Sequence, residues 1–151
     1  MRAVVQRVLR ARVRVGGETV GEVGEGMLVL LGVMRGDGER CADRLAERVA
    51  RLRFFADERG RMNVSAIERG LSALVVSQFT LAADGRKGRR PSFDRAAPAE
   101  LAEPLCERFV ARLRALGLAT ASGRFGAVMQ VELTNDGPVT FVLDELPEGP
   151  V

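Results

Sequence analysis

The sequence predicts an α+β fold, a mostly antiparallel β-sheet or partial barrel with two main helices packed on it. Three observations predict this class. Apolar residues alternate with polar ones near the start, two later segments have apolar residues every three or four positions, and two other runs are almost entirely apolar. At 151 residues the chain has the length of one domain. We therefore predict a single domain over 1–151, with an irregular tail over 144–151 that contains two prolines.

The first part of the chain has the pattern of strands. Alternation over 3–15 predicts a strand with one face on the core, and the two glycines at 16–17 predict a hairpin turn into a short strand over 18–22. The run MLVLLGV at 27–33 lacks polar side chains, which is typical of a central strand covered on both faces. Asp37-Gly38 closes this section.

Two segments have the spacing of helices. Over 40–55 apolar residues recur every three or four positions while arginine and glutamate fill the other face, which predicts an amphipathic helix. A second helix is expected from about residue 101, ended by Gly117. Its start is set by Pro104, which we place in the first turn because a proline in a helix interior costs roughly 3 kcal/mol.

Turns and strands account for the rest of the chain. Glycine-containing turns at 57–61 and at Gly70 precede a second buried strand over 71–81, and a polar surface loop over 84–94 follows it. Near the end, strands over 127–133 and 139–143 flank the turn sequence TNDGP. We expect these last two strands to form a hairpin.

The composition excludes several chemistries. Because the chain contains no His, it cannot form a Ser-His-Asp triad, a Cys-His pair or a His-ligated zinc site. Cys41 and Cys106 are far apart, and each falls inside a helical pattern, so we interpret both as buried, reduced thiols. The sequence therefore predicts neither a cofactor nor a metal site.

The charge of the chain allows two interpretations. The net charge is +3, and Lys87 is the one lysine among 23 basic residues. Guanidinium groups suit phosphates and nucleic-acid bases, but an arginine-rich genome or an ion-paired surface gives the same count, and charge alone favours that interpretation. The longest uncharged apolar run, 27–34, is far shorter than the ~18 residues of a membrane-spanning helix. We expect a cytoplasmic protein without signal peptide or membrane anchor.

Two polar segments lie where strands are expected to end: SQFT at 77–80 and NDGPVT at 135–140. The side chains of Ser77, Gln78 and Thr80 can form hydrogen bonds with the backbone at a sheet edge, or they can line a pocket. A threonine nucleophile needs a neighbouring base, and no histidine is present to act as one. The Gly137-Pro138 pair is most simply turn punctuation.

Together the two segments resemble the D-aminoacyl-tRNA deacylase family. The conjunction of SQFT with NxGPVT is more specific than either motif alone. The likeness covers residues 1 to 144 in order and includes AVVQRV at 3–8, GMLVLLGV at 26–33, RPSF at 90–93, GRF at 123–125 and MQV at 129–131.

This resemblance implies a homodimeric enzyme that hydrolyses the ester joining a D-amino acid, or glycine, to the terminal ribose of tRNA. It implies that Gly137 and Pro138, joined by a cis peptide bond, enter the partner's pocket, where their backbone carbonyls exclude an L side chain. The backbone N–H groups of Phe79 and Thr80 would stabilise the oxyanion, with the Thr80 hydroxyl helping to position substrate. The 2′-OH of the RNA would replace the missing protein base.

The resemblance also assigns substrate contacts. It implies that Ser77 and Gln78 shape the pocket and that Phe125 and Met129 hold the terminal adenosine, although both also suit a sheet core. Arg7 is expected either to brace the Gly-Pro segment or to pair at the surface. Possible contacts to acceptor-stem phosphates are Arg86, Lys87, Arg89 and Arg90.

Two other functions stay open at this point. A basic RNA-binding module could have the same fold without hydrolysis, with SQFT as sheet architecture only. An editing domain of the kind attached to some threonyl-tRNA synthetases would instead reject a noncognate L-amino acid. The Gly137-Pro138 pair favours the D-specific alternative, and deacylation assays distinguish all three.

Overall fold

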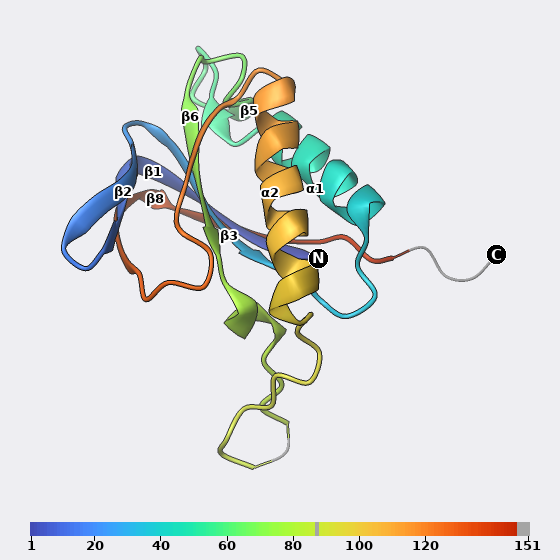
Figure 1. The fold of residues 1–151 in the computed structure, drawn as a ribbon. Coiled ribbons are helices and arrows are strands. Elements are labelled where there is room, and N and C mark those ends of the chain that lie inside the picture. The colour runs from blue at the N-terminus through green and yellow to red at the C-terminus, as the bar shows by residue number, and fades with distance from the viewer. Residues whose placement is uncertain (87, 148–151) are drawn as a thin grey trace.

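The computed structural model describes residues 1–86 and 88–147 (Figure 1). Its helices are α1 (Glu39–Arg51), the 3₁₀ helix η1 (Phe79–Ala82) and α2 (Ala99–Ala115). Its strands are β1 (Arg2–Val15), β2 (Glu18–Val23), β3 (Gly26–Gly32), β4 (Phe55–Ala56), β5 (Met62–Val64), β6 (Ser72–Ser77), β7 (Ala119–Ser122) and β8 (Gln130–Asp144). None of the described helices is long and apolar enough to cross a membrane.

One mixed sheet forms the centre of the fold, in the order β2-β1-β3-β6-β7, with β8 also paired to β1. Strand β1 is antiparallel to β2, β3 and β8, while β3–β6 and β6–β7 are parallel pairs. Figure 1 shows α1 and α2 side by side against one face of this sheet. The predicted α+β class is confirmed, with a sheet that is mixed and mostly antiparallel.

The sheet curls until its two ends nearly meet. A Cβ placed on Gly21 of β2 would lie only 2.6 Å from the carbonyl oxygen of Ser122 in β7. Glycine therefore permits the close approach of these two strands, which makes the sheet a nearly closed barrel.

Alternate side chains of the central strands fill two separate cores. One core lies between the sheet and the helices and includes Val29 and Leu31 of β3 and Phe109 of α2. The other lies inside the curl of the sheet and includes Leu28 and Leu74. The prediction that 27–33 is covered on both faces is confirmed, because neighbouring residues of β3 belong to different cores.

The first helix is shorter than predicted. It ends at Arg51, since Leu52 is extended (φ −63°, ψ 125°), and the expected helix over 40–55 is wrong beyond that point. Phe54 and Phe55 are both buried, and their rings pack with centroids 4.4 Å apart. Phe54 also packs edge-on against Phe141 of β8, with ring centroids 5.7 Å apart, so the extended chain after Arg51 brings these rings into the core against a distant strand.

The second helix begins two residues earlier than expected, and Pro104 lies inside it rather than in its first turn. Pro98 caps the start, where its carbonyl accepts bonds from the N–H groups of Leu101 and Ala102, both at 3.0 Å. The bond that Pro104 cannot donate would go to the carbonyl of Glu100, an exposed residue that water can satisfy. The predicted end is confirmed, with Gly117 at φ +92°.

The strand predicted over 71–81 ends at Ser77, after which the chain forms η1. Strand β7 and the small β4–β5 pair were not predicted. These strands have only two to four residues each, too few to show the alternation that identifies a strand.

The predicted hairpin over 127–143 is wrong. Residues 130 to 144 form one strand, β8, antiparallel to β1. In the ladder Val8 faces Asn135 but Gln6 faces Thr140, so several residues of β8 bulge out opposite one residue of β1. The sequence TNDGP therefore marks a bulge rather than a reversal, because β1 is long enough to pair with both halves.

The end of the described chain is held to α1. Glu145, which is buried, pairs with Arg48 at 2.9 Å and with Arg44 at 3.1 Å. The predicted tail begins at Asp144, but this residue belongs to β8, and 145–147 have no regular structure. The rest of the predicted tail, 148–151, lies outside the described residues.

Closure of the barrel predicts effects of different size for two glycine substitutions. Gly21→Ala should lower the free energy of unfolding by about 1–3 kcal/mol, because its methyl group would collide with the Ser122 carbonyl. Gly24→Ala is the matched control, since nothing lies within 4 Å of the added Cβ, and it should change stability by less than about 1 kcal/mol. Urea denaturation measures both, and equal midpoints would contradict the close β2–β7 contact.

Candidate functional site

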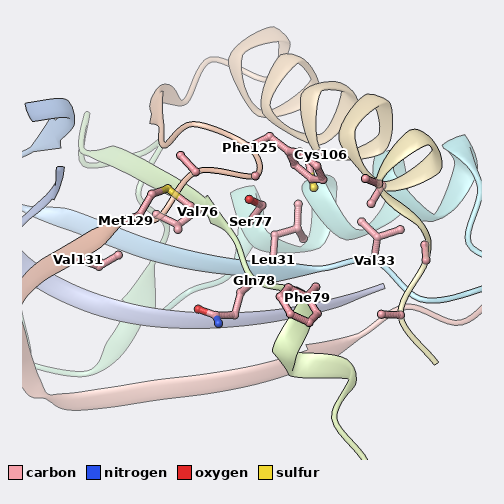
Figure 2. Close-up of a pocket in the computed structure, with 16 residues that line it drawn as sticks. Leu31, Val33, Val76, Ser77, Gln78, Phe79, Cys106, Phe125, Met129 and Val131 are labelled. Carbon is pink, nitrogen blue, oxygen red and sulfur yellow. The ribbon is translucent and has the colours of Figure 1, made fainter. Parts of the chain in front are cut away.

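The main cleft lies between the ends of β3 and β6, the first half of α2 and the segment 125–131 (Figure 2). Its volume is about 430 Å³, and its lining is largely apolar. The sequence-predicted residues that it brings together are Ser77, Gln78, Phe79, Phe125 and Met129. They come from two distant parts of the chain, so only folding unites them.

The SQFT segment turns away from the sheet at the rim of this cleft. The N–H of Gln78 still donates to the carbonyl of Leu31 at 2.8 Å, and η1 begins at the next residue. The first amides of a helical turn have no carbonyl partner within it. In the described residues, the N–H groups of Phe79 and Thr80 donate to no other group. Two unpaired donors therefore stand next to the cleft.

The side chains of this segment differ in their positions. Phe79 is 60% exposed and packs edge-on against Phe93, with ring centroids 5.1 Å apart. Thr80 does not line the cleft, but its hydroxyl accepts a hydrogen bond from the side-chain amide of Gln78, which does. Gln78 thus links Thr80 to the cleft.

Phe125 and Met129 come from a segment that folds back tightly on itself. The N–H of Gly123 donates to the carbonyl of Val75 at 2.9 Å, and a Cβ on Gly123 would lie 2.7 Å from the sulfur of Met129. Each residue lines the cleft and also packs against a core, so the core interpretation is confirmed, while contact with the terminal adenosine stays a prediction.

Gly137 and Pro138 do not line the main cleft of their own chain. They lie in the bulge of β8, both are exposed, and the peptide bond between them is cis. Arg7 holds the start of the bulge: its Nε donates to the Asp136 carbonyl at 3.1 Å and lies 3.3 Å from the Asp136 carboxylate. Its Nη1 donates to the carbonyl of Phe54 at 3.0 Å. The expectation that Arg7 braces this segment is confirmed.

The basic loop over 84–94 is closed by two backbone hydrogen bonds between Asp84 and Ser92, both 2.8 Å. Arg86 binds the Asp84 carboxylate with Nε at 2.9 Å, and this guanidinium holds the pKa of Asp84 well below its usual range. Arg86 therefore forms an ion pair with Asp84 within the loop. Arg89 and Arg90 are exposed, and Lys87 lies outside the described residues.

Cys106 and five alanines also line the cleft, and sequence reasoning did not identify them as cleft residues. The alanines are Ala96, Ala97, Ala99, Ala102 and Ala127. The clustering of four of them around the start of α2 was the available signal, because small side chains leave room between packed elements. Both cysteines are free, as predicted, and Cys41 is buried while Cys106 is only partly so. Burial, together with Glu103 and Glu107, raises the pKa of Cys106 to about 12.

The chemistry that this cleft supports follows from its lining. It offers apolar surface for a ring or chain and backbone donors at one end, while its one titratable side chain is a thiol that stays protonated near neutral pH. The described residues contain no cluster of three or more metal-ligating side chains. The arrangement suits a substrate with a carbonyl group that needs stabilisation by backbone N–H groups.

Comparisons with known proteins agree with one another. A family model described as D-Tyr-tRNA(Tyr) deacylase matches residues 4–144. A protein of Symbiobacterium thermophilum called D-aminoacyl-tRNA deacylase is 64% identical over 144 residues, 95% of either chain. One of the same name from Roseiflexus sp. (strain RS-1) is 60% identical, covering 95% of this chain and 93% of the relative.

Two solved structures have the same fold. The one titled c-Myc DNA Unwinding Element Binding Protein is 41% identical, with a TM-score of 0.90 over 97% of this chain and 99% of that one. A probable eukaryotic D-amino acid tRNA deacylase has a TM-score of 0.81 over 95% of this chain and 98% of that one. At 18% identity, this second likeness concerns the fold alone.

The raised pKa of Cys106 predicts how its thiol reacts. In a Cys41→Ala variant, alkylation by iodoacetamide should be slow at pH 8 and should increase with pH toward an apparent pKa near 12, since the thiolate is the reactive form. The same variant unfolded in urea is the control and should titrate near ~8.5. A folded-state titration near that control value would contradict the burial of Cys106.

Proposed function

The chain belongs to the D-aminoacyl-tRNA deacylase family and is a hydrolase, and from this premise we propose how its residues act. The substrate of the proposed reaction is the ester that joins a D-amino acid, or glycine, to the terminal ribose of tRNA. The observation that carries the proposal is the pair of unbonded amides, those of Phe79 and Thr80, beside an apolar cleft. The reaction would take place in the cytoplasm.

In the proposed mechanism the two amides bind the ester carbonyl oxygen. When water attacks the ester, negative charge develops on this oxygen, and preorganised N–H donors stabilise it more than they stabilise the neutral carbonyl. The turn that presents the amides is anchored by the Gln78 to Leu31 hydrogen bond. Ser77 and Gln78 shape the cleft around the ester, and the Thr80 hydroxyl, held by Gln78, helps to position the substrate.

No side chain of the cleft is suited to be the general base. Cys106 keeps its proton near neutral pH because its pKa is about 12. The ester of an amino acid on ribose brings a vicinal hydroxyl with it. We therefore assign the assisting role to the 2′-OH of the terminal adenosine, directly or through a water molecule.

The remaining contacts place the RNA. Phe125 and Met129 offer the terminal adenine an apolar surface for stacking. Arg89 and Arg90, exposed on the loop that follows SQFT, would meet acceptor-stem phosphates together with Lys87, whereas Arg86 pairs with Asp84. Such contacts give affinity that falls with salt and carries little sequence preference.

Selection of the D enantiomer is assigned to Gly137 and Pro138 of a second copy of the chain. Both residues are exposed and lie outside the cleft of their own chain, so they can screen a substrate only in another subunit. Their backbone carbonyls would occupy the space that an L side chain needs, while a D side chain points elsewhere and glycine has none. Selection by exclusion requires a rigid wall, which the hydrogen bonds of Arg7 favour.

The two other functions considered for this sequence are less well supported. A module that only binds RNA would not account for family membership among hydrolases. An editing domain for L-amino acids would not need an exposed Gly-Pro bulge held by Arg7. Assays with both enantiomers decide between these alternatives.

The assisting role of the RNA predicts a strong effect of one oxygen atom. Purified protein should deacylate D-aminoacyl-tRNA, and a substrate that ends in 2′-deoxyadenosine should react at least about 100-fold more slowly, since proton transfer contributes roughly 10²–10⁴ to such rates. Thr80→Ala should keep measurable activity, because the hydroxyl only positions substrate. Single-turnover rates measure both effects. Complete loss with Thr80→Ala and full activity on the deoxy substrate would instead indicate a threonine nucleophile.

Chiral selection should depend on the hydrogen bonds that hold the bulge. Arg7→Gln removes charge-assisted bonds to the Asp136 and Phe54 carbonyls, worth about 1.5–3 kcal/mol each. The ratio of L to D hydrolysis should therefore rise about tenfold or more. Arg12→Gln is the matched control, because Arg12 is on the same strand but binds Glu132 instead. If Arg7→Gln hydrolyses L-aminoacyl-tRNA no faster than the Arg12→Gln control does, Arg7 has no role in chiral selection.

A further inference from the structure

A second hollow, here called the side groove, continues from the main cleft along α2. Its volume is about 360 Å³, and it shares Ser77, Cys106 and Phe125 with the main cleft. Figure 2 shows Phe125 next to Cys106, between α2 and the segment that carries Met129. The two hollows therefore form one trough, with Phe125 at the point where they join.

The two parts of this trough differ in chemistry. The main cleft has no charged side chain in its lining, whereas four charged side chains line the side groove. Glu103, Glu107 and Arg114 lie on one stripe of α2, four and seven residues apart, and Arg124 faces them from the other wall. A site for apolar groups thus opens into a site for a polar, partly anionic group.

The arginines of the side groove are available in different ways. Arg114 donates from Nε and Nη2 to the carbonyl of Thr120, at 3.1 and 2.9 Å. These two hydrogen bonds fix the guanidinium in place, but the carbonyl is neutral and does not cancel its positive charge. Arg124 is exposed and adjoins Phe125 in the chain. The exposed guanidinium of Arg124, next to Phe125 at the joint of the trough, suits a phosphate that passes from one part to the other, while the fixed guanidinium of Arg114 lies two turns farther along α2.

We propose that the side groove binds the penultimate nucleotide of the RNA, with Arg124 on the phosphate that links it to the terminal adenosine. This inference rests on the proposed function, which places the terminal adenine at Phe125 and Met129. The trough gives a strand whose last nucleotide fills the main cleft a continuous path past Phe125 into the side groove. A base bound in the side groove would contact charged side chains rather than apolar surface.

The carboxylates of the groove also indicate which base it accepts. Glu103 and Glu107 are acceptors only, and they pair with an exocyclic amine such as N4 of cytosine. Uracil has a carbonyl oxygen at the corresponding position, which carboxylates repel. The side groove therefore favours cytidine over uridine before the terminal adenosine.

Short substrates separate this inference from the proposed function. D-tyrosyl esters of adenosine, of the dinucleotide CpA and of UpA are hydrolysed in parallel, with the uncatalysed rates subtracted. We expect kcat/KM for the CpA ester to exceed that for the adenosine ester about tenfold, as one charge-assisted phosphate contact provides. For the UpA ester, kcat/KM should be only slightly higher than for the adenosine ester. Hydrolysis of the adenosine ester by itself tests the proposed function.

Variants then assign the gain to residues. Arg124→Gln should abolish the advantage of CpA over adenosine and leave the rate on the adenosine ester unchanged, and Glu103→Gln should narrow the difference between CpA and UpA. Arg61→Gln, an exposed arginine outside both hollows, is the control and should change neither ratio. Equal rates on CpA and adenosine esters, or an Arg124→Gln effect of the same size on both, would overturn the inference while the proposed function stands. Failure to hydrolyse any of the D-tyrosyl esters would overturn both.

Discussion

The ladder between β1 and β8 is the constraint on which the rest of this structure depends. Strand β1 is long enough to pair with β3 and β2 along one edge while β8 runs along the other. Residues of β8 that exceed the matching length of β1 must leave the sheet, and they do so between Asn135 and Thr140. Arg7 projects from β1 at this interruption and binds the carbonyl of Asp136. The same ladder thus joins the last strand to the sheet and holds the Gly-Pro bulge at the surface.

The main cleft exists because several elements end at the same place. Strand β6 stops at Ser77, the chain turns at Gln78, and α2 begins behind a stretch of alanines. The turn leaves the amides of Phe79 and Thr80 unpaired, while the small side chains leave space beside them. A site built this way needs no unusual side chain, which is consistent with a chain that contains no histidine.

Arginine has two uses in this protein. On one side of the fold it joins the helices: Arg108 binds Asp43 at 2.8 Å and lowers the pKa of that carboxyl, and Arg112 binds Glu47. Exposed pairs of this kind add little stability individually. Arg89, on the loop after η1, and Arg124, in the side groove, are exposed, and their proposed role is to contact RNA. The composition could not separate these uses, because a guanidinium is paired or available according to its neighbours in space.

The sequence by itself determined the fold class, the two-sided burial of 27–33, the end of α2 at Gly117 and the identity of the two motif segments. These features depend on local periodicity, on glycine's conformational freedom, or on motifs that are read directly. Only the tertiary structure decided that Phe54 and Phe55 leave the helix, that TNDGP is a bulge and not a hairpin turn, and that Cys106 and the side groove adjoin the SQFT segment. Each of these depends on which distant segment lies alongside, and the pairing partner of a strand or the neighbour of a helix face is chosen by long-range packing that no local pattern contains.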